Sequence, residues 1–81
     1  MKIGNEVNLL KGFIEYKSGN KIEAQKIFEK IYSKFNDNPE LNYFLGKCFL
    51  ENENNENKSK KYIEKALKLG YVLETKNQNV K

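Results

Sequence analysis

Apolar side chains recur along this chain every three or four residues, in four separate segments. That spacing places apolar side chains on one face of an α-helix. We therefore predict four helices, which span residues 5–17, 21–35, 40–51 and 58–69. The third segment is apolar nearly all round, so we expect its helix to be buried on several sides. The fourth is expected to turn inward Tyr62, Ile63, Ala66, Leu67 and Leu69.

Turn-forming residues separate the predicted helices. Gly19 can adopt the left-handed conformation that ends many helices, and Gly70 stands in the same place after the fourth segment. Pro39 suits the first position of the third helix. The polar run at residues 52–57 is expected to form a loop. The sequence thus predicts an all-α fold of two antiparallel helix-turn-helix units.

The two predicted units match each other at a spacing of 34 to 35 residues. Gly12 and Gly46 are 34 residues apart, and Phe28 precedes Ile63 by 35. Two antiparallel helices can cross closely only where one lacks bulk. We therefore expect close crossings at Gly12 with Ala24 and at Gly46 with Ser59, and we expect Phe28 and Ile63 to fill the space beside them.

This spacing, together with the run LGKCF at residues 45–49, resembles the tetratricopeptide repeat, whose period is about 34 residues. The resemblance covers residues 5–69 and implies a short α-solenoid of two repeats. Repeat one would span residues 5–38 and repeat two residues 39–70. We expect a helical domain over residues 1–73 and a flexible tail over 74–81.

The resemblance implies a protein-interaction scaffold whose first helices line a concave groove. The implied groove residues are Leu9, Phe13, Tyr16, Lys17, Tyr43, Lys47 and Leu50. Further groove places fall on Glu6, Glu40 and Glu51. This mixture of apolar, aromatic and charged side chains favours a peptide or partner helix as the ligand. Alternatively, the aromatic residues pack against each other as core.

The first helix departs from the family pattern because Asn8, Lys11 and Glu15 occupy places where the family prefers apolar residues. Its apolar residues form two rows. One row consists of Val7, Leu10 and Ile14, and the other of Leu9, Phe13 and Tyr16. A rotated helix would bury the first row, and an unrotated helix would leave the second row on the concave side. The sequence leaves both possibilities open.

The composition argues against catalysis and nucleic-acid recognition. The net charge is +4, but all 15 basic residues are Lys, and Arg is the residue best suited to base edges and phosphates. The chain has no His, and it has no Gly-rich phosphate loop or carboxylate cluster with ligand spacing. We expect no enzymatic activity, no cofactor and no metal.

A stripe of four lysines lies along the fourth helix, at Lys58, Lys61, Lys65 and Lys68. We expect it to be a solvated face. The less favoured alternative is a surface for nucleic acid or an acidic partner.

Self-association is a further possibility. Two repeats bury little, and Ile63, Leu67 and Leu69 have no following repeat to cover them. Either residues 71–74 fold back as a partial cap or a second copy of the chain covers this face, as a homodimer.

No apolar run approaches the roughly 20 residues needed to span a membrane, and we expect no signal peptide. The single Cys48 is expected to be a buried, structural thiol, which favours a cytoplasmic location.

Overall fold

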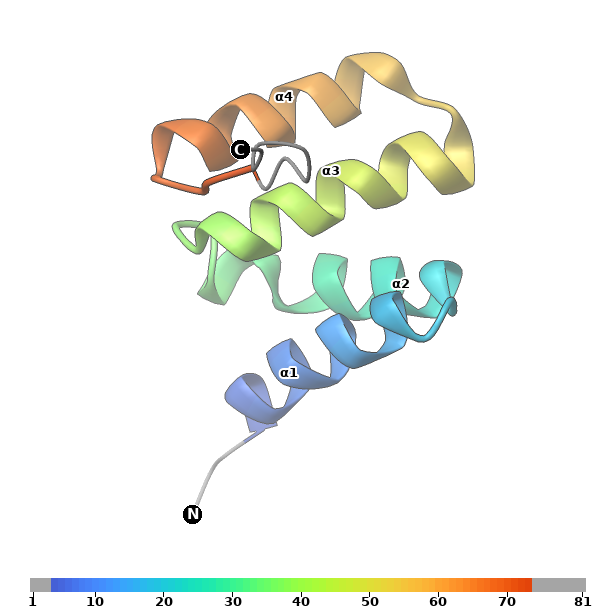
Figure 1. Ribbon diagram of the computed structural model, residues 1–81. Helices are drawn as coiled ribbons and strands as arrows, with labels where there is room; N and C mark the ends of the chain where they lie inside the picture. The colour runs from blue at the N-terminus through green and yellow to red at the C-terminus, as the bar shows by residue number, and fades with distance from the viewer. Residues whose placement is uncertain (1–3, 74–81) are drawn as a thin grey trace, which may run out of the picture.

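The computed structural model describes residues 4–73, which form a stack of four α-helices joined by short turns (Figure 1). The elements are α1 (Gly4–Lys17), α2 (Lys21–Ile31), the 3₁₀ turn η1 (Tyr32–Lys34), α3 (Pro39–Glu53) and α4 (Glu56–Lys68). Each helix packs against the next one in the chain, and α1 also contacts α3. Residues 4–73 contain no strand, so the all-α prediction is confirmed. The predicted tail lies outside the described residues.

Two glycines end helices in the left-handed conformation, as predicted. Gly19 follows α1 with a φ of +98°, and Gly70 follows α4 with a φ of +104°. The residue after each glycine donates its N–H to the carbonyl five residues back, at 2.9 Å in both cases. These bonds satisfy carbonyls that the helix end leaves without a partner. After Gly70 the chain turns back toward α3 (Figure 1).

The connection between α3 and α4 is shorter than the polar loop that the sequence predicts. α3 continues to Glu53 and α4 begins at Glu56, so Asn54 and Asn55 alone lie between the two helices. Asn54 adopts a φ of +52°, in the left-handed region that asparagine tolerates. The side chain of Asn55 accepts a hydrogen bond of 3.1 Å from the N–H of Lys58. The prediction was wrong because these polar residues cap and extend the helices.

α3 starts as predicted, whereas α2 ends earlier. Pro39 is the first residue of α3, and the side chain of Asn38 caps the helix by accepting a bond of 2.8 Å from the N–H of Leu41. The predicted helix over residues 21–35 is too long. The chain tightens into η1, where the Phe35 N–H bonds to the Tyr32 carbonyl at 3.1 Å.

The hydrophobic core lies mainly between α2 and α3. Its buried members are Ala24, Phe28, Leu41, Leu45, Cys48 and Phe49. Two of them come from α2 and four from α3, so α3 contributes most of the core, as expected from its nearly continuous apolar pattern.

Gly12 and Gly46 lie at close helix contacts. A Cβ atom on Gly12 would lie 2.5 Å from the ring of Phe28. A Cβ atom on Gly46 would lie 2.7 Å from the side chain of Ile63 and 3.0 Å from the carbonyl oxygen of Ser59. Neither position has room for a side chain. The predicted close approach of Gly46 to Ser59 is confirmed. Gly12 closely approaches Phe28, and its pairing with Ala24 stays a prediction.

The structure also decides between the two apolar rows of α1. Leu9, Phe13 and Tyr16 pack against the core. The other row is exposed, with exposed fractions of 50% for Val7, 60% for Leu10 and 56% for Ile14. The rotated orientation of α1, which would bury Val7, Leu10 and Ile14, is therefore excluded.

One expectation for the end of the chain needs correction. Leu67 was expected to face inward but is 44% exposed, because α4 packs mainly on α3 and Leu67 lies on its uncovered side. The chain after α4 folds back, and Tyr71 lies against Tyr43 of α3. Whether residues 71–74 also cover α4 stays a prediction, because residue 74 lies outside the described residues.

Candidate functional site

Phe44 on α3 is the centre of a group of aromatic rings. Its centroid lies 5.6 Å from that of Phe13, 5.0 Å from that of Tyr16 and 5.2 Å from that of Tyr43. The ring of Tyr71 stacks on that of Tyr43, with centroids 4.3 Å apart. We call these five residues the aromatic cluster. Each of them is half-buried, so part of each side chain faces solvent.

The cluster is assembled from three separate segments. Phe13 and Tyr16 lie three residues apart on α1 and therefore share a face of that helix. Tyr43 and Phe44 are neighbours on α3, and the turn at Gly70 returns the chain to them. The ring of Phe13 also lies 5.5 Å from that of the buried Phe28, and this contact fixes the cluster to the core.

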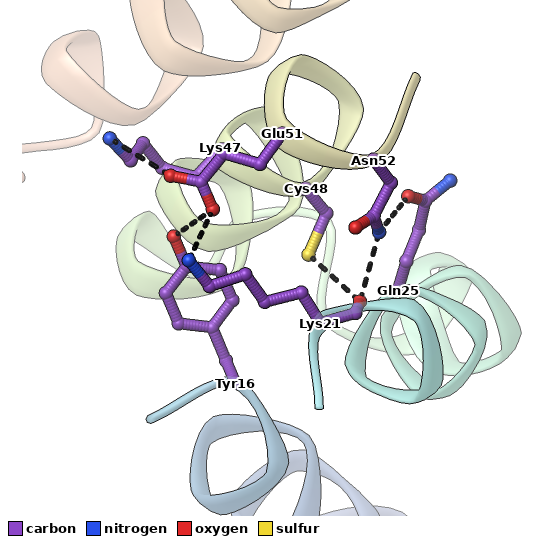
Figure 2. Close-up of polar contacts among 7 residues, drawn as sticks. All are labelled: Tyr16, Lys21, Gln25, Lys47, Cys48, Glu51 and Asn52. Atoms are coloured by element: carbon purple, nitrogen blue, oxygen red, sulfur yellow. Dashed lines mark hydrogen bonds and ion pairs between the residues drawn. The ribbon is translucent and has the colours of Figure 1, made fainter. Parts of the chain in front are cut away.

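The hydroxyl of Tyr16 is part of a polar network around Glu51 (Figure 2). It donates a hydrogen bond of 2.8 Å to Oε1 of Glu51. The same oxygen pairs with Nζ of Lys21 at 3.0 Å, and Oε2 pairs with Nζ of Lys47 at 3.5 Å. The network therefore joins α1, α2 and α3 beside the aromatic cluster.

The network holds its two acidic groups in opposite protonation states. Burial alone would raise the pKa of the Glu51 carboxyl, but the hydrogen bond from Tyr16 and the charge of Lys21 outweigh burial and hold that pKa below 4.5. Burial and the bond to Glu51 together raise the pKa of the Tyr16 phenol well above its usual value. Tyr16 thus stays a donor and Glu51 an acceptor.

The other half of Figure 2 shows how α3 is fastened to the start of α2. The carbonyl of Lys21 accepts a bond of 3.0 Å from the side-chain amide of Asn52 and one of 3.7 Å from the thiol of Cys48. The amide of Asn52 also donates to Oε1 of Gln25 at 2.8 Å. Burial, reinforced by the charge of Glu51, raises the pKa of Cys48 to about 12. The thiol therefore stays protonated, as expected of a structural cysteine.

The structure brings together most of the seven groove residues that the sequence indicates. Phe13, Tyr16 and Tyr43 belong to the aromatic cluster, and Nζ of Lys17 lies 5.6 Å from the centroid of Phe44. Lys47 reaches the cluster through Glu51. The remaining two are half-buried: Leu9 packs against the core, and Leu50 lies on α3.

Two central members of the cluster were missing from that set. Phe44 lies next to Tyr43 in the sequence, and its position one residue further round α3 turns it toward α1. Tyr71 follows the left-handed Gly70, and that turn is the signal in the sequence that could have placed it near α3. No periodic pattern in the sequence predicts the ring contacts of Phe44 and Tyr71, because both depend on how separate segments pack.

Within residues 4–73, no group of three or more Cys, Asp or Glu side chains is placed to hold a metal ion. The helices in this part of the chain are too short or too polar to cross a membrane. Comparisons with protein-family models, with curated proteins and with solved structures found no match.

Proposed function

We propose that this chain is a protein-interaction module that binds a peptide or helix of a partner at the aromatic cluster. The observation that carries the proposal is that five half-buried rings from three segments meet in one cluster, with Phe44 at its centre. Aromatic side chains are enriched in protein interfaces and supply many of their strongest contacts. Lys17 and the Lys47–Glu51 pair flank the rings with charge, as a polar rim would.

The chemistry of the cluster favours an apolar or aromatic anchor in the partner. Tyr71 already stacks on one face of Tyr43 with an angle of 14° between the rings, so a planar ring fits this surface. Phe44 and Phe13 supply apolar area beside that stack. An amphipathic helix or an extended segment with an exposed aromatic residue would meet these requirements.

We further propose that the two hairpins are tetratricopeptide-like repeats. The close crossings at Gly12 and Gly46 support this interpretation, since they recur in corresponding helices 34 residues apart. In that architecture α1 and α3 are the first helices of their repeats, and these are the helices that carry the four cluster residues other than Tyr71.

Photo-crosslinking tests the proposed surface. A benzophenone amino acid at position 17, beside Phe44, should capture a partner from an extract of the source cells. The same amino acid at the exposed position 60 on α4 is the control and should capture little. Tyr43→Ala, introduced with the label at position 17, should weaken binding by about 2 kcal/mol, as for an interface hot spot. Equal capture from both positions, or capture that Tyr43→Ala leaves unchanged, would contradict the proposal.

Self-association is the second candidate, and the exposed row of α1 favours it. Val7, Leu10 and Ile14 are each at least half exposed and lie along one side of the helix. Two such rows from two copies would cover each other. Light scattering over a range of concentrations should then detect a dimer, and Leu10→Lys should return it to a monomer. A parent chain that stays monomeric throughout would exclude this candidate.

We also propose a cytoplasmic location. Cys48 is the one cysteine in the sequence, and it is buried, so the chain has no internal disulfide. Unpaired buried thiols are typical of reducing compartments.

A further inference from the structure

A basic hollow lies between η1 and α4, and none of its residues belongs to the aromatic cluster. Its volume is about 580 Å³, and it is lined by Tyr32, Lys61, Tyr62, Glu64, Lys65 and Lys68. Three ammonium groups and one carboxylate give the lining an excess of two positive charges. The ion pairs within residues 4–73 all involve Glu51, so no carboxylate of these residues lies within ion-pair distance of the three lysines of the hollow.

Three of the four lysines in the predicted stripe line this hollow. The fourth, Lys58, is directed elsewhere, with its Nζ 4.9 Å from the ring centroid of Phe49. Glu29 of α2 acts electrostatically on Tyr62 from nearby, but it is hydrogen-bonded to Gln25 and does not line the hollow. The local field at the hollow is therefore positive.

One of these lysines is held in place by groups that reach the core. Nζ of Lys65 donates a hydrogen bond of 3.2 Å to the hydroxyl of Tyr32. That hydroxyl donates its own proton to Oδ1 of Asn42 at 2.7 Å, and the side chain of Asn42 is completely buried. The amide of Asn42 is fixed in turn by the carbonyls of Asn36 and Asn38, at 3.1 Å and 2.8 Å.

This chain of bonds makes Lys65 a pre-positioned cation. An ordinary surface lysine loses rotamer freedom when it meets a ligand, whereas Lys65 is half-buried and already restrained. An ammonium group has three N–H donors, and the bond to Tyr32 uses one of them. The other two remain for a ligand oxygen or for water.

We propose that this hollow binds a phosphate group, either as the free ion or as a monoester. A phosphate dianion matches the excess of two positive charges, and ammonium groups bind phosphate as point charges. The sequence has no Arg, so the point charges of lysines, and not a planar guanidinium fork, would hold the phosphate. The rings of Tyr32 and Tyr62 meet edge to face at 5.4 Å and form an aromatic wall on which the organic part of a monoester would rest.

Nuclear magnetic resonance titration of the full chain tests this proposal. Inorganic phosphate, phenyl phosphate and benzoate are each added at neutral pH and constant ionic strength. Both phosphates should shift the backbone amides of Tyr32, Lys61 and Lys65 in a saturable manner, and benzoate should not. Tighter binding of phenyl phosphate than of inorganic phosphate assigns the site to a monoester, and equal binding assigns it to the free ion.

Two variants with the same change of charge separate this site from general attraction to a basic protein. Lys65→Gln should weaken phosphate binding by about fivefold, as for the loss of a partly exposed charge contact. Lys60→Gln, on the same helix but outside the hollow, should leave binding nearly unchanged. Tyr32→Phe keeps the ring but removes the hydroxyl that holds Lys65, so it should weaken phosphate binding as well. If Tyr32→Phe folds poorly, the result for Lys65→Gln decides the test.

Three results would overturn the proposal. The first is a set of shifts that grow linearly with phosphate and never saturate. The second is benzoate binding as tightly as phenyl phosphate, and the third is an equal loss of binding in Lys60→Gln and Lys65→Gln.

Discussion

The two hairpins use the same kind of glycine crossing, yet they bury their first helices to very different extents. Of the residues in α1, Gly12 alone is fully buried. α3 buries Leu41, Asn42, Leu45, Gly46, Cys48 and Phe49. The difference follows from position in the stack, because α3 packs against both α2 and α4, whereas α1 packs mainly against α2. An apolar pattern thus predicts a helix, but its neighbours decide how much of that helix is buried.

The sharpest test of this contrast is a bulky residue at each crossing. Gly46→Leu should abolish cooperative unfolding, because the new side chain would meet the backbone oxygen of Ser59 and the buried side of Ile63. Overpacking costs about 1–3 kcal/mol or more, a large part of the stability of a small domain. Gly12→Leu should be milder, since α1 has fewer neighbours and can shift outward. Thermal melting followed by circular dichroism measures both, and an unchanged melting temperature in Gly46→Leu would refute the close crossing.

Truncating one aromatic ring in each hairpin should distinguish a residue that stabilises the core from a residue that binds the partner. Phe49 is 3% exposed, so Phe49→Ala should cost about 3–5 kcal/mol and much of the helix content. Phe13 is half-buried, so Phe13→Ala should lower stability less and mainly weaken binding of the partner. Urea unfolding and affinity measurements would show this division. If both variants unfold equally, Phe13 serves the core and the binding surface lies elsewhere.

The junction between the hairpins should weaken in acid. Because the folded-state pKa of Glu51 lies below 4.5, its ionised contacts stabilise the protein above that pH, and this stabilisation is lost as the pH falls further. The parent should therefore exceed Glu51→Gln in stability at neutral pH by up to about 1 kcal/mol, the range for partly exposed pairs. Melting of both proteins over a pH series measures the difference, and a gap that stays constant through pH 4.5 contradicts the assignment.

The smallest effect is expected from the lysines of the basic hollow on α4. Changing Lys61, Lys65 and Lys68 together to Gln should alter stability by less than about 0.5 kcal/mol and leave binding of the protein partner nearly intact. Melting and partner affinity at two salt concentrations check this. Loss of partner binding, together with a steep salt dependence in the parent, would move the interaction surface from the aromatic cluster to α4.

Features set by local chemistry were predictable from the sequence. The four helices follow from apolar spacing, and the turns at Gly19 and Gly70 follow from the need for a positive φ. The crossings at Gly12 and Gly46 were also predictable, because two bulky rows can approach closely only where a side chain is missing.

Features that depend on packing between distant segments were not predictable in the same way. The polar run after α3 gave no sign that Asn54 and Asn55 would cap two helices. The exposure of Leu67 depends on the absence of a covering helix in the described chain, not on its own periodicity. Phe44 is the centre of the cluster because α1 lies beside α3 in the fold. The tetratricopeptide-like interpretation and the groove residues stay predictions.

The thiol of Cys48 gives this protein a built-in reporter of its own opening. It is completely buried and bonded to the carbonyl of Lys21, and the sequence has no second cysteine. A thiol reagent needs both access and a thiolate, so labelling must wait until α2 and α3 come apart. The rate at which Cys48 of the unmodified chain is labelled therefore reports how often the two hairpins separate. A bound partner that bridges α1 and α3 should slow this labelling.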